Sequence, residues 1–577
     1  MRFLRLPALH IVFLLTLAGF LLGIGFAPSR LGILVYCGFV PLLIVLEQTH
    51  GLGQTLRRLY WTFFVFHGLS NWWVSSWQPE ADPYLMVAGI VLWIGHPFFF
   101  AVPMLGYMAL RRRLGRASAL VSLPFLWTAF EWLHSLGEAS YPWQALGYTQ
   151  AYYTPVIQIA DITGVWGISW IIVAVNAAWA SVVLSFRDVP QSCTIPLLQR
   201  LVYAVSCSKR EIVLVLGLML GILMYGTVRV RDYAHTTLTQ KLPCIHIGII
   251  QPNINPWGKW QRNAHDQVLL HIHLSDSLRV AHRLARSANL DAVLWSETAI
   301  PYRILLPQYY PYFEALRAWT DSTHTAIITG LPSDRIYRSR HEAPVTATAI
   351  PRMFDTLYLE SFNSATIIQA HTITTPYDAL SGYSSLLPLH RKMKLTPFAE
   401  RVPYAEVFSF AAKALTWSVG ISGWGLGREQ QPLSLVRSTD TVHIGMIICI
   451  ESIYPSFVAE YARRGARLLA VITNDGWFNH TPGPEQHYMI AALRAVETRR
   501  YLARCANTGV SGFITPLGTS LQRTAVDTQQ ALATALPLCS STSLYVAWGD
   551  WLPLASCLWA AIACLWAATK HRSSVRP

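Results

Sequence analysis

Charged residues are scarce in this chain. Only 13% of its 577 residues are Asp, Glu, Lys or Arg, and 53% are hydrophobic. An average soluble domain contains about 25% charged residues. The shortage excludes an ordinary soluble enzyme.

Motifs for metals and nucleotides are also missing. The sequence contains no CxxC pair, no HExxH motif and no Gly-rich phosphate loop. These patterns supply the usual ligands for zinc and for nucleotide phosphates. We therefore expect no metal and no other cofactor. The nine cysteines predict no disulfide framework, although Cys244, Cys505 and Cys539 could pair in an oxidising compartment.

Long hydrophobic runs are abundant, and a membrane helix needs about 20 such residues. Seven runs precede residue 230 and an eighth lies near the C-terminus, at about 8–27, 31–47, 60–78, 84–110, 117–136, 155–185, 212–228 and 545–568. About 300 residues of ordinary charge content separate the last two. The pattern predicts a polytopic helical membrane bundle of about eight spans (1–230), an extracytoplasmic domain (231–540), and a last span with a basic tail (541–577).

Basic residues lie in every second connection between the predicted spans. Arg57 and Arg58 follow the second run, Arg111–Arg113 follow the fourth, and Lys570 follows the last. Cytoplasmic loops carry such an excess of Lys and Arg. We therefore expect both termini in the cytoplasm and the large domain outside. This distribution also accounts for much of the net charge of +14, so nucleic-acid binding is not expected.

The polar region alternates between short apolar runs and amphipathic segments. HIGIIQ, AVLW, GMII and LLAVI read as buried strands, and residues 265–286 and 484–506 as helices. This alternation favours a layered α/β domain. Ligands bind beyond the carboxyl ends of the strands in such sheets, which is where Asn253, Glu297, Cys449 and Asn474 are expected.

Five residues of this region are candidates for catalysis. Cys449 ends a strand and could be a small core residue or a nucleophile whose pKa a nearby Lys and a helix N-terminus lower. Glu297 could cap a turn or serve as the general base, and Lys392 could be a solvated loop cation or stabilise an oxyanion. Glu400 and Glu451 could be surface charges or could orient Lys392 and the thiol.

Two further residues carry a structural and a functional interpretation. Trp260 could pack at a lipid interface or line an acyl-chain channel. Glu131 lies inside the fifth predicted span, where a carboxylate is a functional candidate, but its position near the outer end also suits a structural role.

The motifs WSETAIP, KMKLTPFAERVPY, MIICIES and NDGWF resemble those of the nitrilase, or carbon–nitrogen hydrolase, superfamily. The resemblance implies an αββα sandwich and a Glu–Lys–Cys triad at Glu297, Lys392 and Cys449. Lys392 is chosen over Arg391 and Lys394 because it lies five residues before Pro397, as in the superfamily's motif. Together with the predicted spans, the chain resembles the apolipoprotein N-acyltransferase family.

This second resemblance implies a ping-pong acyl transfer in the cytoplasmic membrane of a bacterium, with the catalytic domain in the periplasm. Cys449 would take an acyl chain from a membrane phospholipid and pass it to the amine of a diacylglyceryl-cysteine apolipoprotein. Glu400 and Glu451 would support the triad, and Trp260 would bind substrate. The family often has an aromatic residue directly after the nucleophile, where this chain has Ile450.

Two other interpretations remain open at this point. A membrane-tethered amidase would use the same triad to hydrolyse carbon–nitrogen bonds. A transporter or receptor with a degenerate nitrilase-like sensor domain would need none of its residues for chemistry. From the eight spans we also expect a monomer.

Overall fold

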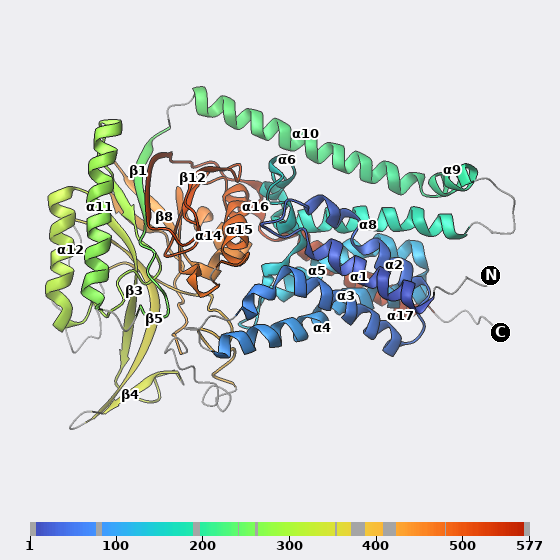
Figure 1. Ribbon diagram of the computed structural model, residues 1–577, viewed down its shortest axis with the longest axis horizontal. Coiled ribbons are helices and arrows are strands. Elements are labelled where there is room, and N and C mark those ends of the chain that lie inside the picture. Colours follow the sequence, from blue (N-terminus) through green and yellow to red (C-terminus); the bar gives the residue numbers. More distant parts are fainter. Residues whose placement is uncertain are drawn as a thin grey trace.

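The computed structural model describes residues 7–76, 83–188, 197–239, 242–259, 263–344, 346–351, 355–370, 387–407, 423–478 and 480–570. Figure 1 shows helices from both ends of the chain gathered at one end of the molecule and the strands at the other. This arrangement agrees with the predicted fold class, a helical bundle together with an α/β region.

Among the described residues, the bundle contains eight helical segments, each of which overlaps one of the eight apolar runs. They are α1 (Ala8–Gly23), α2 (Phe39–Glu47), α3 (Leu52–Ser70), α4 (Pro83–Leu114), α5 (Arg116–His134), α8 (Val165–Asp188), α10 (Lys209–Thr239) and α17 (Trp551–Thr569). Within the described residues, four of them, α4, α8, α10 and α17, are long and apolar enough to cross a membrane. The number of spans therefore stays a prediction. A shorter helix, α9 (Leu197–Cys207), precedes α10.

The α/β region contains two sheets. The first has the strand order β13-β1-β2-β3-β5-β4, with β6 paired to β5, and the second has the order β12-β11-β10-β9-β8-β7. Strands β1 (Cys244–Gln251), β2 (Ala292–Leu294) and β3 (Ala326–Tyr337) are parallel. So are β8 (Thr441–Ile448), β9 (Leu468–Thr473) and β10 (Leu502–Ala506). The remaining strands are β4 (Thr348–Pro351), β5 (Thr356–Ile368), β6 (Leu389–Arg391), β7 (Leu433–Val436), β11 (Gly512–Ile514), β12 (Ser520–Arg523) and β13 (Gln530–Pro537).

Helices cover the outer face of each sheet. One hydrophobic cluster lies between the two sheets and contains Ile247 and Met446. A second joins the first sheet to α11 (Ala264–Arg286) and α12 (Tyr310–Thr323). The order of layers is therefore helix, sheet, sheet, helix, as predicted, because strands buried on both faces need apolar side chains on both sides.

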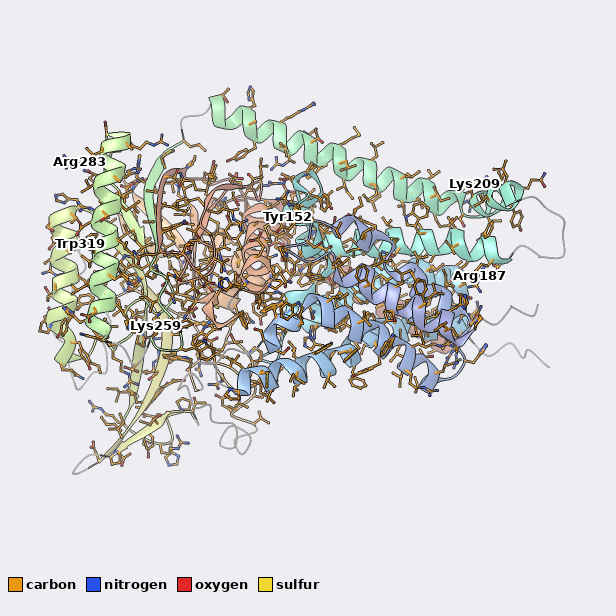
Figure 2. All side chains as sticks on the ribbon, in the orientation of Figure 1. Tyr152, Arg187, Lys209, Lys259, Arg283 and Trp319 are labelled. Atoms are coloured by element: carbon orange, nitrogen blue, oxygen red, sulfur yellow. The ribbon has the colours of Figure 1, made fainter. Side chains whose placement is uncertain are left out.

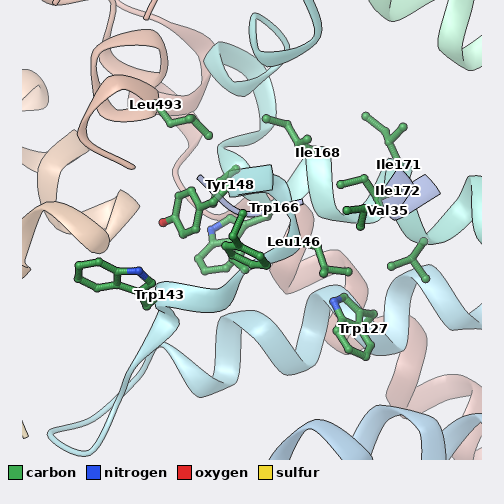
Figure 3. Packing of buried hydrophobic residues seen from close by; sticks show 14 of the residues in the cluster. Val35, Trp127, Trp143, Leu146, Tyr148, Trp166, Ile168, Ile171, Ile172 and Leu493 are labelled. Atoms are coloured by element: carbon green, nitrogen blue, oxygen red, sulfur yellow. The ribbon is translucent and has the colours of Figure 1, made fainter. Parts of the chain in front are cut away.

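The outer helices of the second sheet, α14 (Pro455–Arg463) and α15 (Gly483–Thr498), also pack against the bundle. Figure 3 shows Leu493 of α15 in the same apolar cluster as Tyr148 and Trp166 of the bundle. One continuous core thus extends from the helical bundle into the α/β region.

The predicted helix over 484–506 is wrong in its last third. Helix α15 ends at Thr498, and the next residue, Arg499, takes a left-handed conformation with φ of 52°. Residues Leu502–Ala506 form β10, which pairs with β9 and β11 in the middle of the sheet. Pairing with two strands outweighs the helical pattern of the local sequence.

Candidate active site

Cys449 lies at a sharp turn at the carboxyl end of β8. Its φ is 53°, a left-handed conformation that is uncommon for a residue with a side chain and that costs free energy. The Ser452 hydroxyl donates to the Cys449 carbonyl at 2.9 Å, and His487 Nε2 lies 3.1 Å from the same oxygen. These contacts hold the strained backbone in place.

Glu297 follows β2 and is 5% exposed. Its Oε1 accepts hydrogen bonds from Asn363 Nδ2 at 2.7 Å and from Lys392 Nζ at 3.1 Å. Gly330 leaves room for the turn, since a Cβ there would come within 2.5 Å of the Thr298 amide nitrogen. A close approach of β3 therefore fixes where the carboxylate sits.

Lys392 is buried between two carboxylates. Its Nζ donates to Glu400 Oε1 at 2.7 Å as well as to Glu297. Burial opposes the charge, but Glu297 and Glu400 raise the pKa of Lys392 well above its ordinary value. Thr396 donates to Glu400 Oε2 through both its amide and its hydroxyl, at 2.8 and 2.9 Å. Lys392 is thus a permanent, oriented cation.

The Cys449 thiol is less acidic than the sequence predicted. Burial and the Glu297 carboxylate raise the pKa of Cys449 above its ordinary value, and Lys392 offsets only part of this rise. The predicted lowering of its pKa is therefore wrong. At rest the sulfur carries its proton, so it needs a base to become a nucleophile.

Glu451 joins the turn at Cys449 to the segment that carries Lys392. Its two carboxylate oxygens accept from the Met393 amide at 2.6 Å and the Ile448 amide at 2.7 Å. His390 Nε2 lies 2.9 Å from the second oxygen. The contacts are made with backbone on both sides of the site, so Glu451 acts on the relative position of Cys449 and Lys392.

The structure also connects the predicted strand ends. The Asn253 amide donates to the Asn507 carbonyl at 3.0 Å, and Asn507 Nδ2 donates to Asn474 Oδ1 at 3.0 Å. Asp475 contacts His487 at 2.8 Å, and His487 reaches the Cys449 carbonyl. Asn253 and Asn474 therefore belong to a supporting network beside the triad.

Asn363 and His487 are contacts that sequence reasoning missed. Asn363 donates to Glu297 from the middle of β5, and its backbone carbonyl accepts from the Lys392 amide at 2.8 Å. His487 lies on α15 beneath the Cys449 turn. Asn363 stands among the mixed residues of ESFNSAT, so no local pattern in the sequence marks it.

The other sequence candidates have mixed outcomes. Trp260 lies outside the described residues. Glu131 is buried and accepts from Trp127 Nε1 at 2.7 Å and the Leu146 amide at 2.9 Å, contacts that tie two bundle segments together. Ile450 is 4% exposed and packs in the apolar core. Among the described residues, no group of three or more His, Cys, Asp or Glu side chains could hold a metal ion.

Comparisons with known proteins place the α/β region among the carbon–nitrogen hydrolases. Residues 246–523 match the family model of carbon–nitrogen hydrolases. Solved structures with a similar region include an amidase from Nesterenkonia sp., at 18% identity and a TM-score of 0.32 over 52% of this chain and 94% of that one. A carbon–nitrogen hydrolase from Helicobacter pylori matches at 15% identity and a TM-score of 0.34, over 53% and 94%.

The particular family follows from the whole chain. Residues 18–178 match the model of the apolipoprotein N-acyltransferase N-terminal domain. The chain is 32% identical to the apolipoprotein N-acyltransferase of Chlorobaculum tepidum over 97% of both proteins. It is 26% identical to that of Geobacter metallireducens over 93% of this chain and 91% of the relative. The chain belongs to the apolipoprotein N-acyltransferase family.

Proposed function

We propose that this protein transfers an acyl chain from a membrane phospholipid to the N-terminal amine of diacylglyceryl-cysteine apolipoproteins. The observation that carries the proposal is a buried ammonium, Lys392, held by Glu297 and Glu400 beside a thiol on a strained turn. Its place in a chain of this family, with apolar helices long enough to span a membrane, supports the two lipid substrates.

Each triad member takes one role in this proposal. Glu297 accepts the proton of the Cys449 thiol when an ester enters, and the sulfur attacks the acyl carbonyl carbon. Lys392 stabilises the negative charge that develops on the carbonyl oxygen. The carbon–oxygen bond to the glycerol then breaks, Glu297 returns the proton to that oxygen, and a lysophospholipid leaves a thioester on Cys449.

The acceptor amine completes the cycle. Its nitrogen attacks the thioester carbonyl, the carbon–sulfur bond breaks, and an amide forms. The amine gives up a proton through Glu297, and the thiolate regains one. Because water competes with the amine for the thioester, the packing of the partly buried Cys449 against the apolar cluster between the sheets favours transfer over hydrolysis.

The arrangement in the membrane is part of the proposal. Residues 1–230 and 541–577 would form the membrane bundle of about eight spans, with both termini in the cytoplasm. Residues 231–540 would form the catalytic domain on the periplasmic side, and the protein would act as a monomer. Trp260 would contact substrate at the entrance, and neither metal nor cofactor would take part.

Intact-mass spectrometry of the purified chain tests the reaction. After incubation with phosphatidylethanolamine, we expect a mass increase of one acyl chain that hydroxylamine removes and that Cys449→Ala lacks. Adding a diacylglyceryl peptide should discharge the adduct and give a triacylated peptide. Folded protein that gains no acyl group from any phospholipid but hydrolyses soluble amides would instead support the amidase, which membership in this family does not favour.

A further inference from the structure

A second buried lysine lies directly behind the proposed base. Lys259 is 2% exposed. Its Nζ donates to the Glu297 backbone carbonyl at 3.0 Å and to Thr298 Oγ1 at 2.9 Å. Thr298 is itself strained, with φ of 47°. Lys259 therefore holds the turn that presents Glu297. Figure 2 labels it near the strands, at the other end of the molecule from Lys209.

The two partners of Lys259 are a carbonyl and a hydroxyl, which is unusual for a buried ammonium. A buried charge is normally paired with an opposite charge. Burial lowers the pKa of Lys259 to about 7, and the nearby Glu297 charge opposes that fall. Both hydrogen bonds survive deprotonation because a neutral amine keeps two N–H groups. Titration of Lys259 thus changes its charge without releasing the turn.

The charges of the site do not balance without this residue. Glu297 and Glu400 are two carboxylates that share one ammonium, Lys392. Desolvated charges are costly unless neutralised nearby, and an unbalanced carboxylate tends to take up a proton. A protonated Glu297 could not accept the thiol proton. Protonated Lys259 is the second cation, and below its pKa it brings the group to two negative and two positive charges.

Other titratable groups around the site leave this balance unchanged. Burial lowers the pKa of His271, which lies on α11 beside Lys259, to about 4, so it is neutral. Asp475, which faces Cys449, is paired with Arg504 at 2.7 Å. Glu451, across the site, contacts His390 and two backbone amides. The neutral Cys449 thiol and Tyr454, whose pKa burial raises to about 12, add no charge near neutral pH.

We propose that Lys259 is a positioning residue for acylation: it holds the Glu297–Thr298 turn and supplies the positive charge that keeps Glu297 ionised. The inference rests on the proposed role of Glu297 as the base. It assigns to Lys259 an effect on the protonation of Glu297 that a purely structural hydrogen bond would not have.

The pH dependence of thioester formation tests this assignment. The rate of Cys449 acylation from phosphatidylethanolamine is measured by intact mass between pH 5 and 9 for the full-length wild type, Lys259→Gln and Lys259→Arg. Lys209→Met, which removes an ammonium at the opposite end of the molecule (Figure 2), is the matched control. Gln keeps a hydrogen-bond donor without the charge, and Arg keeps the charge.

In Lys259→Gln the acidic limb of the profile should move about one pH unit upward, because an opposite charge near a carboxylate shifts its pKa by roughly 1–3 units. That shift lowers the rate about tenfold on the acidic side. Lys259→Arg should keep the acidic limb of the pH–rate profile at the wild-type pH, even if the larger guanidinium group lowers the rate at every pH. If Gln does not fold, Lys259→Met must show the same shift.

An acidic limb that stays in place in every uncharged variant, or that moves equally in Lys259→Arg, overturns the inference. Failure of the proposed function looks different, since the wild type itself would then form no thioester. The Lys209→Met profile separates both outcomes from a general effect of losing a positive charge.

Discussion

Replacing Glu451 by Gln should break one of the two hydrogen bonds that hold the Cys449 turn against the Lys392 segment, with almost no change in side-chain size. Both Glu451 oxygens accept from backbone amides, Met393 on one side and Ile448 on the other, at 2.6 and 2.7 Å. A glutamine has one oxygen, so its NH₂ group must face one of the two amide donors. Glu451 is fully buried, and water cannot take the lost acceptor's place.

The expected cost follows from that count. One hydrogen bond to a charged group is lost, worth about 1.5–3 kcal/mol, and one buried N–H is left opposite another donor. A total of about 3 kcal/mol corresponds to a roughly 100-fold loss of rate if all of it is expressed in the transition state. Part of it should also appear as a lower thermal unfolding midpoint.

The assay compares acyl-thioester formation and thermal unfolding in detergent for the wild type, Glu451→Gln and Glu460→Gln. Glu460 is a matched control because its ion pairs with Arg463 and Arg464 lie at the surface, where such pairs contribute little. A Glu451→Gln protein that acylates at the wild-type rate and melts at the wild-type temperature would refute the bridging role.

Three further predictions concern the surroundings of the site. Gly330→Ala should slow acylation at least tenfold, because its Cβ would lie 2.5 Å from the Thr298 nitrogen and 3.0 Å from Glu297 Cα, whereas Gly217→Ala, which meets open space, should not. Asn363→Leu should slow acylation about 10- to 100-fold by removing a donor to Glu297 worth about 1.5–3 kcal/mol, as measured by intact mass beside Ser364→Ala. The folded-state pKa of His271 is lowered to about 4 from 6.5, so the unfolded chain binds more protons in that window and stability falls as the pH drops through it. Between pH 6.5 and 5 the loss is about 1.6 kcal/mol. His271→Leu should reduce this slope in thermal unfolding, and an unchanged slope would contradict a neutral buried imidazole.

The sequence predicts best where one local pattern decides the outcome. Each of the eight apolar runs overlaps a described helix, and the strands β2 and β8 end shortly before Glu297 and Cys449 as expected. The alternation of buried strands and amphipathic helices indicated a layered α/β domain, and the resemblance to the nitrilase superfamily implied the sandwich. In these elements the burial of hydrophobic residues determines the structure, and hydrophobic residues can be recognised directly in the sequence.

Features that depend on long-range contacts could not be read in this way. The strand Leu502–Ala506 has a helical local pattern and becomes a strand only because β9 and β11 lie on either side. The acidity of Cys449 depends on how much water reaches it and on its distance from Glu297 as well as Lys392. Lys259 and Asn363 are ordinary polar residues in the sequence, and only the fold brings them to Glu297.

The contact between α15 and the bundle consists of buried polar anchors as well as apolar packing. Arg499 reaches Asp161 at 2.6 Å and Gln158 at 2.7 Å, and Gln486 Nε2 donates to the Ala27 carbonyl at 3.0 Å. Leaving such buried polar groups without partners costs free energy. The α/β region produced without the bundle would therefore expose both these polar groups and the apolar surface around them. These hydrogen bonds fix the position of the α/β region, and with it the Cys449 sulfur, relative to the bundle. In the proposed membrane arrangement, the Cys449 sulfur would therefore reach only those lipid bonds that lie at one depth of the bilayer.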